Sequence, residues 1–343
     1  MLNWGILGTG MIAGKVLPCI RAAHRCAVTA VGSRDALRAQ AFAVEHDLPE
    51  STGCDAEALL TRDDIHAVYV TSPNSLHVPW CLRLLGAGKH VLCEKPLTPR
   101  AQEAEQIAAA AKRWGKVFAE GLMYLHHPQS ELLVRAGAMT SDPTPDNLIG
   151  PLHTIVASFC IDLRPRANAW TRFSHRLEGG AMMDLGCYPL SLARAVTGLE
   201  PAEITAISRA GTPIEGESRP VDSLTGFTAR FPNGVILHAL CAIDANAGIF
   251  AELVGDWGIL RTETPFRADP VHAVVRLTRF ENHPRGPGVE HITIANGGDR
   301  FTNQFTAFAA ATRGERAMTP TPEWSIGQAR AIERVYELNG LGW

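Results

Sequence analysis

Over its first 120 residues the chain alternates short apolar runs with patterns of helical periodicity. The predicted strands cover residues 3–10, 27–35, 67–74, 90–96 and 116–121. The predicted helices between them cover residues 12–23, 36–48, 77–88 and 99–115. Runs this apolar are typical of strands buried on both faces, and strands joined through helices run parallel. The expected fold is therefore α/β, a doubly wound parallel sheet with helices on both faces.

The pattern changes after residue 121, where strand-like stretches follow one another closely. They cover residues 152–162, 203–210, 224–232, 234–243, 249–260 and 273–281. Asn233 and Gly234 stand between two of them and are a strong hairpin signal, so a mostly antiparallel sheet is expected. Further helical patterns cover residues 179–198, 301–314 and 322–340. Because single cores usually divide beyond ~250–300 residues, we expect two domains. They are residues 1–121 and residues 122–343, with the last helix docking back.

Composition excludes several classes of partner. The formal net charge is −3, and lysine and arginine are spread along the chain without blocks, so neither nucleic acid nor an anionic membrane is an expected partner. No apolar window reaches the roughly 20 residues of a membrane span, and no targeting segment precedes the first strand. We expect a cytoplasmic protein whose eight scattered cysteines are reduced core residues.

A glycine-rich loop joins the first predicted strand to the first predicted helix. It consists of Gly8, Thr9, Gly10, Met11 and Ile12. Glycines here allow a tight turn and close approach of a pyrophosphate, whose charge is met by the backbone N–H groups of the helix start. The strand–turn–helix setting favours dinucleotide binding over the alternative, a plain tight turn.

The end of the second predicted strand bears on which dinucleotide binds. An acidic residue at this place binds the adenosine ribose of NAD. Ser33 and Arg34 stand there instead, which removes the repulsion of a 2′-phosphate and adds a charged fork suited to it. We therefore expect NADP in preference to NAD. The alternative is that Arg34 only stacks on adenine, which either cofactor permits.

Polar residues also follow the third and fourth long strands, whose carboxyl ends line the ligand crevice of such sheets. The third is followed by Thr71, Ser72, Pro73, Asn74 and His77, which we assign to the cofactor pocket. A structural role for His77 is the alternative.

The fourth strand is followed by Glu94 and Lys95. Lys95 is the predicted proton carrier and is expected to contact both cofactor and substrate. Glu94 is expected beside the nicotinamide. The alternative is that the two residues form an exposed ion pair. A positioned acid–base contributes about 10²- to 10⁴-fold to a rate.

The glycine loop, "SPNSLH", "CEKPL" and "GGAMMDLGCYP" occur in this order over nearly the whole chain. The combination resembles the Gfo/Idh/MocA oxidoreductases. That resemblance implies a Rossmann domain followed by an α+β domain with an open, mostly antiparallel sheet. It also implies Lys95 as the catalytic lysine, with Asp184 and Tyr188 as further catalytic and substrate-binding residues.

Tyr188 stands where many members have histidine, as in the branch with sugar 1-dehydrogenases and dimeric dihydrodiol dehydrogenases. Asp184 and Tyr188 are spaced i, i+4 and share one helix face, and Pro189 requires that they lie near its start. A lysine ammonium beside a phenol favours proton transfer between them. Burial in the core is the alternative role of Tyr188, and helix capping that of Asp184.

Two further pairs complete the predicted site. Trp170 and Arg172 precede the double glycine and are expected to reach the cofactor, whereas Asp162 and Arg164 are expected to line the substrate pocket unless they lie on a surface loop. No metal is expected.

The predicted activity is NAD(P)-dependent hydride transfer to or from a sugar, polyol, diol or carbonyl compound. Two alternatives remain open: a tightly held cofactor used in glycoside hydrolysis or epimerisation, and a non-catalytic dinucleotide sensor. The resemblance implies a homodimer or homotetramer formed through the second domain's sheet.

Overall fold

The computed structural model describes residues 1–137, 147–166 and 169–342. The chain forms two compact units. The first unit joins Met1–Met123 to Asp299–Ala329, and the second joins Tyr124–Gly298 to the segment that begins at Arg330. The last boundary falls within α10 (Pro322–Asn339), the final helix. The chain therefore returns to the first unit after residue 298, which a single boundary near residue 121 leaves out.

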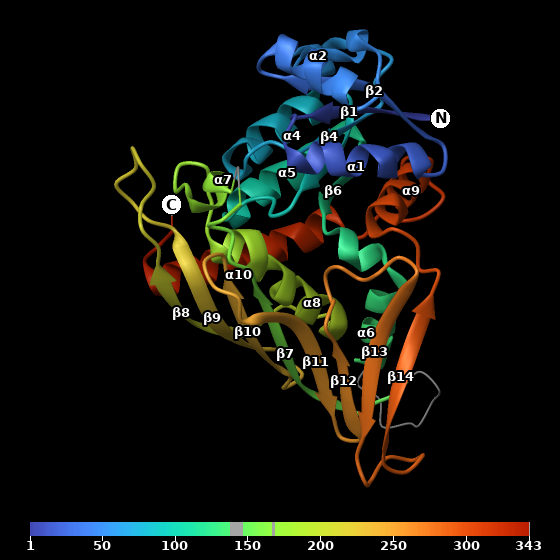
Figure 1. Ribbon diagram of the computed structural model, residues 1–343, viewed down its shortest axis with the longest axis vertical. Coiled ribbons are helices and arrows are strands. Elements are labelled where there is room, and N and C mark those ends of the chain that lie inside the picture. Colours follow the sequence, from blue (N-terminus) through green and yellow to red (C-terminus); the bar gives the residue numbers. More distant parts are fainter. Residues whose placement is uncertain (138–146, 167–168, 343) are drawn as a thin grey trace. The chain divides into compact units, whose positions relative to one another are not determined.

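The first unit contains a six-stranded parallel sheet with the strand order β3-β2-β1-β4-β5-β6 (Figure 1). Its strands are β1 (Leu2–Leu7), β2 (Cys26–Ser33), β3 (Gly53–Asp55), β4 (Ala67–Val70), β5 (His90–Glu94) and β6 (Phe118–Gly121). The predicted doubly wound sheet is confirmed, with the additional short strand β3. The order reverses between β1 and β4, and the crevice at such a switch point is where ligands of these sheets bind.

Helices cover both faces of this sheet. They are α1 (Met11–Ala22), α2 (Ala36–Glu45), α3 (Ala58–Thr61), α4 (His77–Gly86), α5 (Ala101–Trp114) and α9 (Arg300–Thr312), with 3-10 turns at Glu50–Thr52 and Asn74–Leu76. The crossovers from β1 and from β4 proceed in opposite directions along the sheet, so right-handed connections place α1 and α4 on opposite faces. In agreement, α4 packs on α5, and α1 packs on α9.

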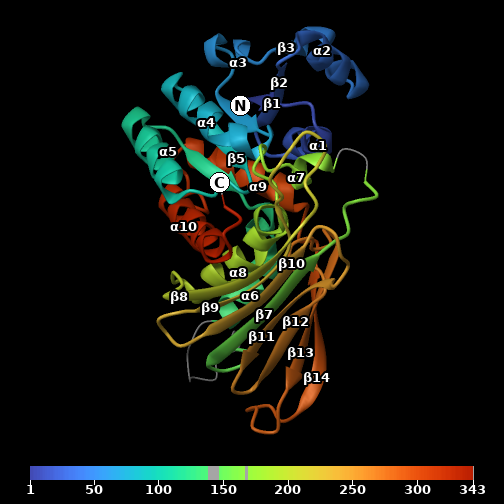
Figure 2. The same ribbon diagram turned by 90° about the vertical axis from the view of Figure 1, so that its left-hand side faces the viewer.

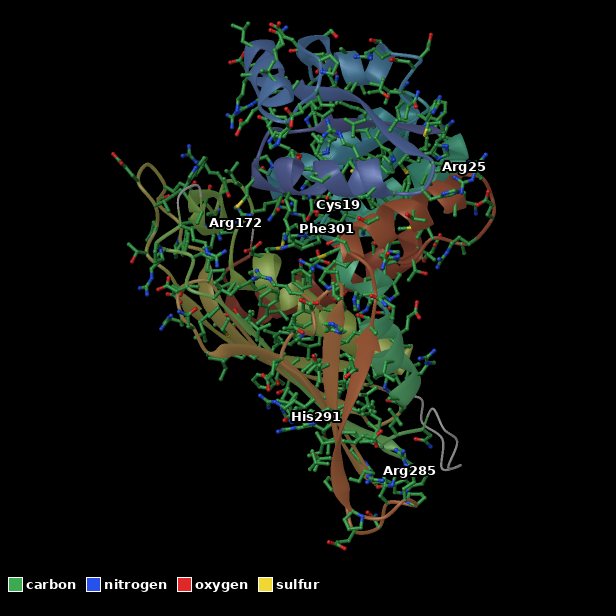
Figure 3. All side chains as sticks on the ribbon, turned by 45° about the vertical axis from the view of Figure 1, so that its right-hand side comes forward. Cys19, Arg25, Arg172, Arg285, His291 and Phe301 are labelled. Carbon is green, nitrogen blue, oxygen red and sulfur yellow. The ribbon has the colours of Figure 1, made fainter. Side chains whose placement is uncertain are left out.

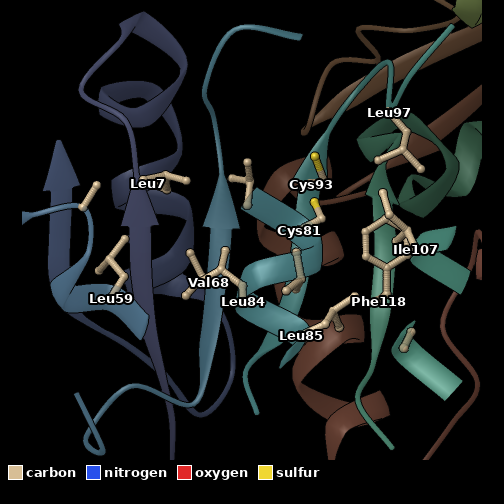
Figure 4. Packing of buried hydrophobic residues seen from close by; sticks show 14 of the residues in the cluster. Leu7, Leu59, Val68, Cys81, Leu84, Leu85, Cys93, Leu97, Ile107 and Phe118 are labelled. Atoms are coloured by element: carbon tan, nitrogen blue, oxygen red, sulfur yellow. The ribbon is translucent and has the colours of Figure 1, made fainter. Parts of the chain in front are cut away.

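Two apolar layers hold this unit together. Figure 4 shows the layer beneath α4 and α5, in which Leu84, Leu85 and Phe118 are fully or almost fully buried. On the other face Trp4 packs against Phe305 of α9, with ring centroids 5.1 Å apart. Each such side chain stabilises the fold by about 1.5–3 kcal/mol through burial. The contact of Trp4 explains why α9, remote in sequence, belongs to the first unit.

The second unit contains an eight-stranded sheet with the order β14-β13-β12-β11-β7-β10-β9-β8. Its strands are β7 (Leu152–Cys160), β8 (Glu203–Ala210), β9 (Asp222–Arg230), β10 (Ile236–Ala242), β11 (Gly248–Gly255), β12 (Gly258–Thr262), β13 (His272–Arg279) and β14 (Gly288–Ala295). All neighbours pair antiparallel except β7 and β10. The predicted open, mostly antiparallel sheet is confirmed.

Three details of this sheet bear on the sequence interpretation. The Asn233-Gly234 turn joins β9 to β10 as predicted, with Gly234 at a φ of 89°. The stretch 249–260 forms two strands instead of one, because the chain turns between Gly255 and Gly258. Strand β14 was not predicted.

Helices lie on one face of this sheet, with α8 packed on β7 and β10 (Figure 2). The helices described in the second unit are α6 (Pro128–Ala136), α7 (Trp170–Phe173), α8 (Cys187–Thr197) and the part of α10 that begins at Arg330. A 3-10 turn, Met123–His126, leads into α6, and a π-helical turn, Met182–Gly186, leads directly into α8. Helix α6 was not predicted. No helix in the described part of the chain is long and apolar enough to cross a membrane.

Candidate functional site

The glycine loop lies at the carboxyl ends of β1 and β4. The Gly8 N–H donates to the carbonyl oxygen of Gly32 at 2.9 Å, and the Thr71 N–H donates to that of Leu7 at 2.9 Å. Gly8 has a φ of 119°, and a Cβ there would lie 2.5 Å from Thr71 Oγ1. Only glycine fits this position, because both the backbone conformation and the neighbouring strand exclude a side chain.

The start of α1 is suited to an anion. Gly10 is its N-cap, and no side chain caps the helix, so the first N–H groups of Met11 and Ile12 are not satisfied by a capping side chain. A Cβ at Gly10 would meet nothing within 4 Å, which leaves space above the helix start. Free N–H groups and the helix dipole attract a phosphate at such an end. These residues fit a dinucleotide pyrophosphate.

The last residue of β2 is Ser33, and the acidic residue that follows it does not stand at the strand end itself. Asp35 caps α2 instead, where its Oδ1 accepts from the N–H groups of Leu37 and Arg38 at 2.9 and 3.3 Å. The Ser33 hydroxyl accepts a 3.4 Å hydrogen bond from the Asp35 N–H. Arg34 is exposed between them. The geometry at this strand end is therefore compatible with a 2′-phosphate.

The ends of β4 and β5 hold the predicted proton carrier. The Tyr69 hydroxyl donates a short hydrogen bond to Glu94 Oε1, and Glu94 Oε2 accepts from the Lys95 N–H at 3.3 Å. Glu94 and Lys95 are both half-buried. The Glu94 carboxylate thus orients the backbone of the residue that carries the lysine.

His77 is buried and joins the loops that follow β4 and β5. Its Nδ1 lies 2.9 Å from the Pro96 carbonyl oxygen, and its Nε2 lies 2.9 Å from that of Ser72. Burial, followed by the charge of Lys95, lowers the pKa of His77 to about 4. A neutral imidazole carries one N–H and donates to only one of these carbonyls, although the geometry offers both. Because both ring nitrogens face backbone carbonyls, the alternative structural role of His77 describes this geometry better than direct contact with a ligand.

The remaining predicted cofactor residues lie in the loop after β4 and in the glycine loop. Pro73 precedes the 3-10 turn Asn74–Leu76, and Asn74 begins it. The Thr71 hydroxyl donates to the Leu7 carbonyl at 2.9 Å. Thr9 is half-buried in the glycine loop.

In the second unit, the double glycine brings Arg172 to Asp184. The Gly180 N–H donates to the Arg172 carbonyl oxygen at 2.7 Å, and the Asp184 N–H donates to that of Gly180 at 2.9 Å. Arg172 Nε lies 3.8 Å from Asp184 Oδ2, and the Asp184 side chain is 18% exposed. Arg172 is labelled in Figure 3. Two residues with separately predicted roles therefore form one ion pair.

Tyr188 lies in an aromatic cluster. It is 5% exposed, and its ring centroid lies 5.2 Å from those of Phe159 and Phe266 and 5.8 Å from that of Tyr124. Pro189 is the third residue of α8, so the proline does lie in the opening turn. Asp184, by contrast, lies in the π-helical turn that precedes α8. The i, i+4 spacing therefore spans a junction between two helix types.

The other predicted pairs lie in α7 and in the segment between β7 and α7. Trp170 begins α7 and is 56% exposed. Asp162 accepts two hydrogen bonds from the Arg164 guanidinium, at 2.9 and 2.7 Å, and these hold the pKa of Asp162 below its usual value. The two side chains of this pair satisfy each other, and their contact with a substrate stays a prediction.

The sequence pattern missed several residues of the second unit. The aromatic neighbours of Tyr188 gave no signal, since each is one apolar residue in an apolar stretch. The sequence also did not indicate that Asp222 and Tyr336, which are buried and hydrogen-bonded to each other, lie next to the double glycine. Lys95 belongs to the first unit and Asp184 and Tyr188 to the second, so their cooperation stays a prediction. Within the described ranges, no group of histidine, cysteine or acidic side chains is arranged to hold a metal.

Comparison with models of protein families identifies the class of protein to which the chain belongs. Residues 2–122 match the model described as "Oxidoreductase family, NAD-binding Rossmann fold". Residues 145–261 match the model "GFO/IDH/MocA C-terminal domain". The chain therefore belongs to the Gfo/Idh/MocA family of oxidoreductases, as the sequence motifs indicated.

Several members of this family are similar over nearly the whole chain. The dTDP-3,4-didehydro-2,6-dideoxy-alpha-D-glucose 3-reductase of Streptomyces violaceoruber is 35% identical over 98% of this chain and 93% of its own. The D-xylose 1-dehydrogenase (NADP(+)) 2 of Haloferax volcanii is 30% identical over 98% and 97%. A crystal structure of a 3-ketoreductase from Actinomadura kijaniata, in complex with NADP and TDP-benzene, is 28% identical with a TM-score of 0.84, covering 98% of both chains.

Proposed function

We propose that the protein is an NADP(H)-dependent oxidoreductase that transfers hydride between nicotinamide and a carbon of a sugar or a related polyol, diol or carbonyl compound. Residues 1–121 would bind the dinucleotide, and residues 122–343 would bind the substrate. The glycine loop and Lys95 carry this proposal, because both follow strands of the same parallel sheet and lie at its carboxyl edge. The names of the reductase from Streptomyces violaceoruber and the dehydrogenase from Haloferax volcanii support an activity on sugars. The first names a sugar linked to a nucleotide, and the second names a free sugar.

Different residues of this chain bind the cofactor, orient the substrate and carry the proton in the proposed reaction. The cofactor, when bound, supplies or accepts the hydride. The α1 N-terminus binds the pyrophosphate, and Lys95 donates a hydrogen bond to the substrate oxygen and carries its proton. Asp184 orients a substrate hydroxyl, held in place by Arg172. Tyr188 is the second proton carrier, and its aromatic surroundings exclude water from it. The proposed assembly is a homodimer or homotetramer through the eight-stranded sheet.

A single screen tests the activity. Free sugars, polyols, diols, carbonyl compounds and nucleotide-linked sugars are offered with NADP(H) and with NAD(H), and nicotinamide absorbance is followed. We expect a substrate-dependent change with NADP(H). Product release without a net absorbance change would indicate hydrolysis or epimerisation with a held cofactor. Binding of NADP without turnover of any compound would indicate a sensor and contradict the proposal.

Arg34→Ala tests the cofactor assignment. Removing the exposed guanidinium at the end of β2 should weaken NADPH binding by about 10- to 100-fold, because charged hydrogen bonds contribute about 1.5–3 kcal/mol. The affinity for NADH should change little. Fluorescence titration of both cofactors measures this difference, with Arg113→Ala on the exposed face of α5 as the control. Equal losses for NADPH and NADH would show that Arg34 stacks on adenine instead.

A further inference from the structure

The double glycine of the second unit approaches a buried carboxylate. Gly180 has a φ of 117°, and a Cβ there would lie 2.2 Å from Asp222 Oδ1 and 3.0 Å from the Tyr336 hydroxyl. A Cβ at Gly179 would lie 2.4 Å from the Arg172 carbonyl oxygen. This turn can therefore form only without side chains, and it places the backbone directly against Asp222.

Asp222 connects three elements of the second unit. Its side chain is fully buried. Oδ2 accepts hydrogen bonds from the Met182 N–H at 2.8 Å and from the Thr225 hydroxyl at 2.7 Å, and Oδ1 accepts from the Tyr336 hydroxyl at 2.9 Å. Asp222 begins β9, Met182 begins the π-helical turn, and Tyr336 lies on α10. One carboxylate thus ties the strand to the start of one helix and the side of another.

The helix start that Asp222 holds carries the predicted substrate residues. The first N–H groups of a helix have no partner within it, and a negative charge there is favourable. The π-helical turn contains Asp184 and continues without a break into α8, which contains Tyr188. A shift of this start would move both side chains, and small misplacements of site residues are costly to a rate.

The geometry points to Asp222 and Tyr336 as positioning residues that fix the helical segment carrying Asp184 and Tyr188. This inference rests on the proposed function, which gives those two residues their roles. Neither Asp222 nor Tyr336 is assigned a contact with substrate or cofactor.

Protonation of Asp222 gives the inference a measurable signature. Burial raises its pKa from 3.8 to about 6, against the opposing effect of its three hydrogen-bond donors. The titratable groups that face it are Tyr336 from α10 and Cys241 from β10, and burial raises the pKa of both. As the pH falls through about 6, the carboxylate gains a proton and loses acceptor capacity toward these donors. We expect kcat to fall in this range.

Stability should change in the opposite direction over the same range. The pKa of Asp222 is higher in the folded protein than in the unfolded chain, so the folded state binds the proton more tightly. The contribution of this group to the free energy of unfolding therefore rises as the pH falls from about 6 toward about 4. A fall in kcat without a fall in stability over this pH range therefore distinguishes protonation of Asp222 from acid unfolding.

The test compares Asp222→Asn and Tyr336→Phe with the wild-type protein for kcat, KM and Tm across this pH range. Asp222→Asn should lower kcat about tenfold, because one buried hydrogen bond that positions the site is lost in the transition state. It should also abolish the fall of kcat below about pH 6, which is the acid limb of the pH profile. Tyr336→Phe should shift the acid limb to higher pH, because it removes a donor that favours the carboxylate. The KM for NADP should stay unchanged in both.

Thr262→Val is the matched control. Thr262 is a buried hydroxyl on β12, which β11, β7 and β10 separate from β9. Its loss should lower Tm without moving the pH profile. Variants of Asp222 and Tyr336 that lose stability while retaining the wild-type kcat and acid limb would overturn the inference. A wild-type protein without NADP-linked turnover would instead overturn the proposed function.

Discussion

Lys95→Ala should lower kcat by about 10²- to 10⁴-fold, the range that a positioned acid–base contributes. The side chain follows β5 at the carboxyl edge of the parallel sheet, while the backbone that carries it is fixed by Glu94 and, through Pro96, by His77. Truncation removes the ammonium group without disturbing these backbone contacts. The affinity for NADP should therefore stay close to that of the wild-type protein. Steady-state rates and a fluorescence titration of NADPH measure the two quantities separately.

Lys112→Ala is the control for this variant, because Lys112 is exposed on α5 of the same unit. It should leave kcat, Kd and Tm unchanged. Turnover by Lys95→Ala at a rate near that of the wild-type protein would remove Lys95 from the mechanism. Loss of NADPH affinity in parallel with kcat would assign the lysine to cofactor binding alone.

The first unit could be predicted almost entirely from the sequence. Its long strands read as separate apolar runs, of which β4 is buried throughout, and the glycine loop lies where the strand–turn–helix pattern places it. The return of α9 to this unit was not visible, because the contact between Trp4 and Phe305 depends on residues far apart in the chain. Periodicity predicts a helix but not the unit on which its apolar face packs.

The second unit was less accessible to sequence reasoning. No residue of strand β14 is buried, and polar residues interrupt its apolar ones, so it lacks the apolar run that identifies a strand. The turn between β11 and β12 contains Trp257, which extended the apparent apolar run through the bend. Asp222 was missed because a lone acidic residue before an apolar stretch is usually a surface residue, whereas here three donors allow its burial.

The candidate site residues differ in how far their roles and contacts could be predicted from the sequence. The strand–turn–helix pattern indicated Gly8, the end of a parallel strand indicated Lys95, and the resemblance to the family implied Asp184; the roles of these residues stay predictions. For His77 the pattern left a cofactor contact and a structural role open, and it could not indicate the contacts of the ring with the backbone carbonyls of Ser72 and Pro96. The hydrogen-bond partners of a histidine are a property of the folded chain.

Gly8→Ala and Gly10→Ala should both impair NADP binding, but for different physical reasons. At Gly8 a side chain meets Thr71 Oγ1 at 2.5 Å and requires a φ of 119°, a strained conformation that costs on the order of 1–3 kcal/mol. Gly8→Ala should therefore lower both Tm and NADP affinity. At Gly10 the φ is −80° and a Cβ meets nothing within 4 Å, so Gly10→Ala should fold with an unchanged Tm.

The methyl group at Gly10 would nevertheless occupy the space above the α1 N-terminus, where the pyrophosphate is proposed to bind. The affinity of the Gly10→Ala variant for NADPH should fall by at least about tenfold, which is ~1.4 kcal/mol. Gly86→Ala on α4 is the control, because a Cβ there also meets nothing within 4 Å and alanine favours a helix. Differential scanning calorimetry and NADPH titration of the three variants separate strain from occlusion. If Gly10→Ala binds NADPH as tightly as the wild-type protein, the dinucleotide does not approach this helix start.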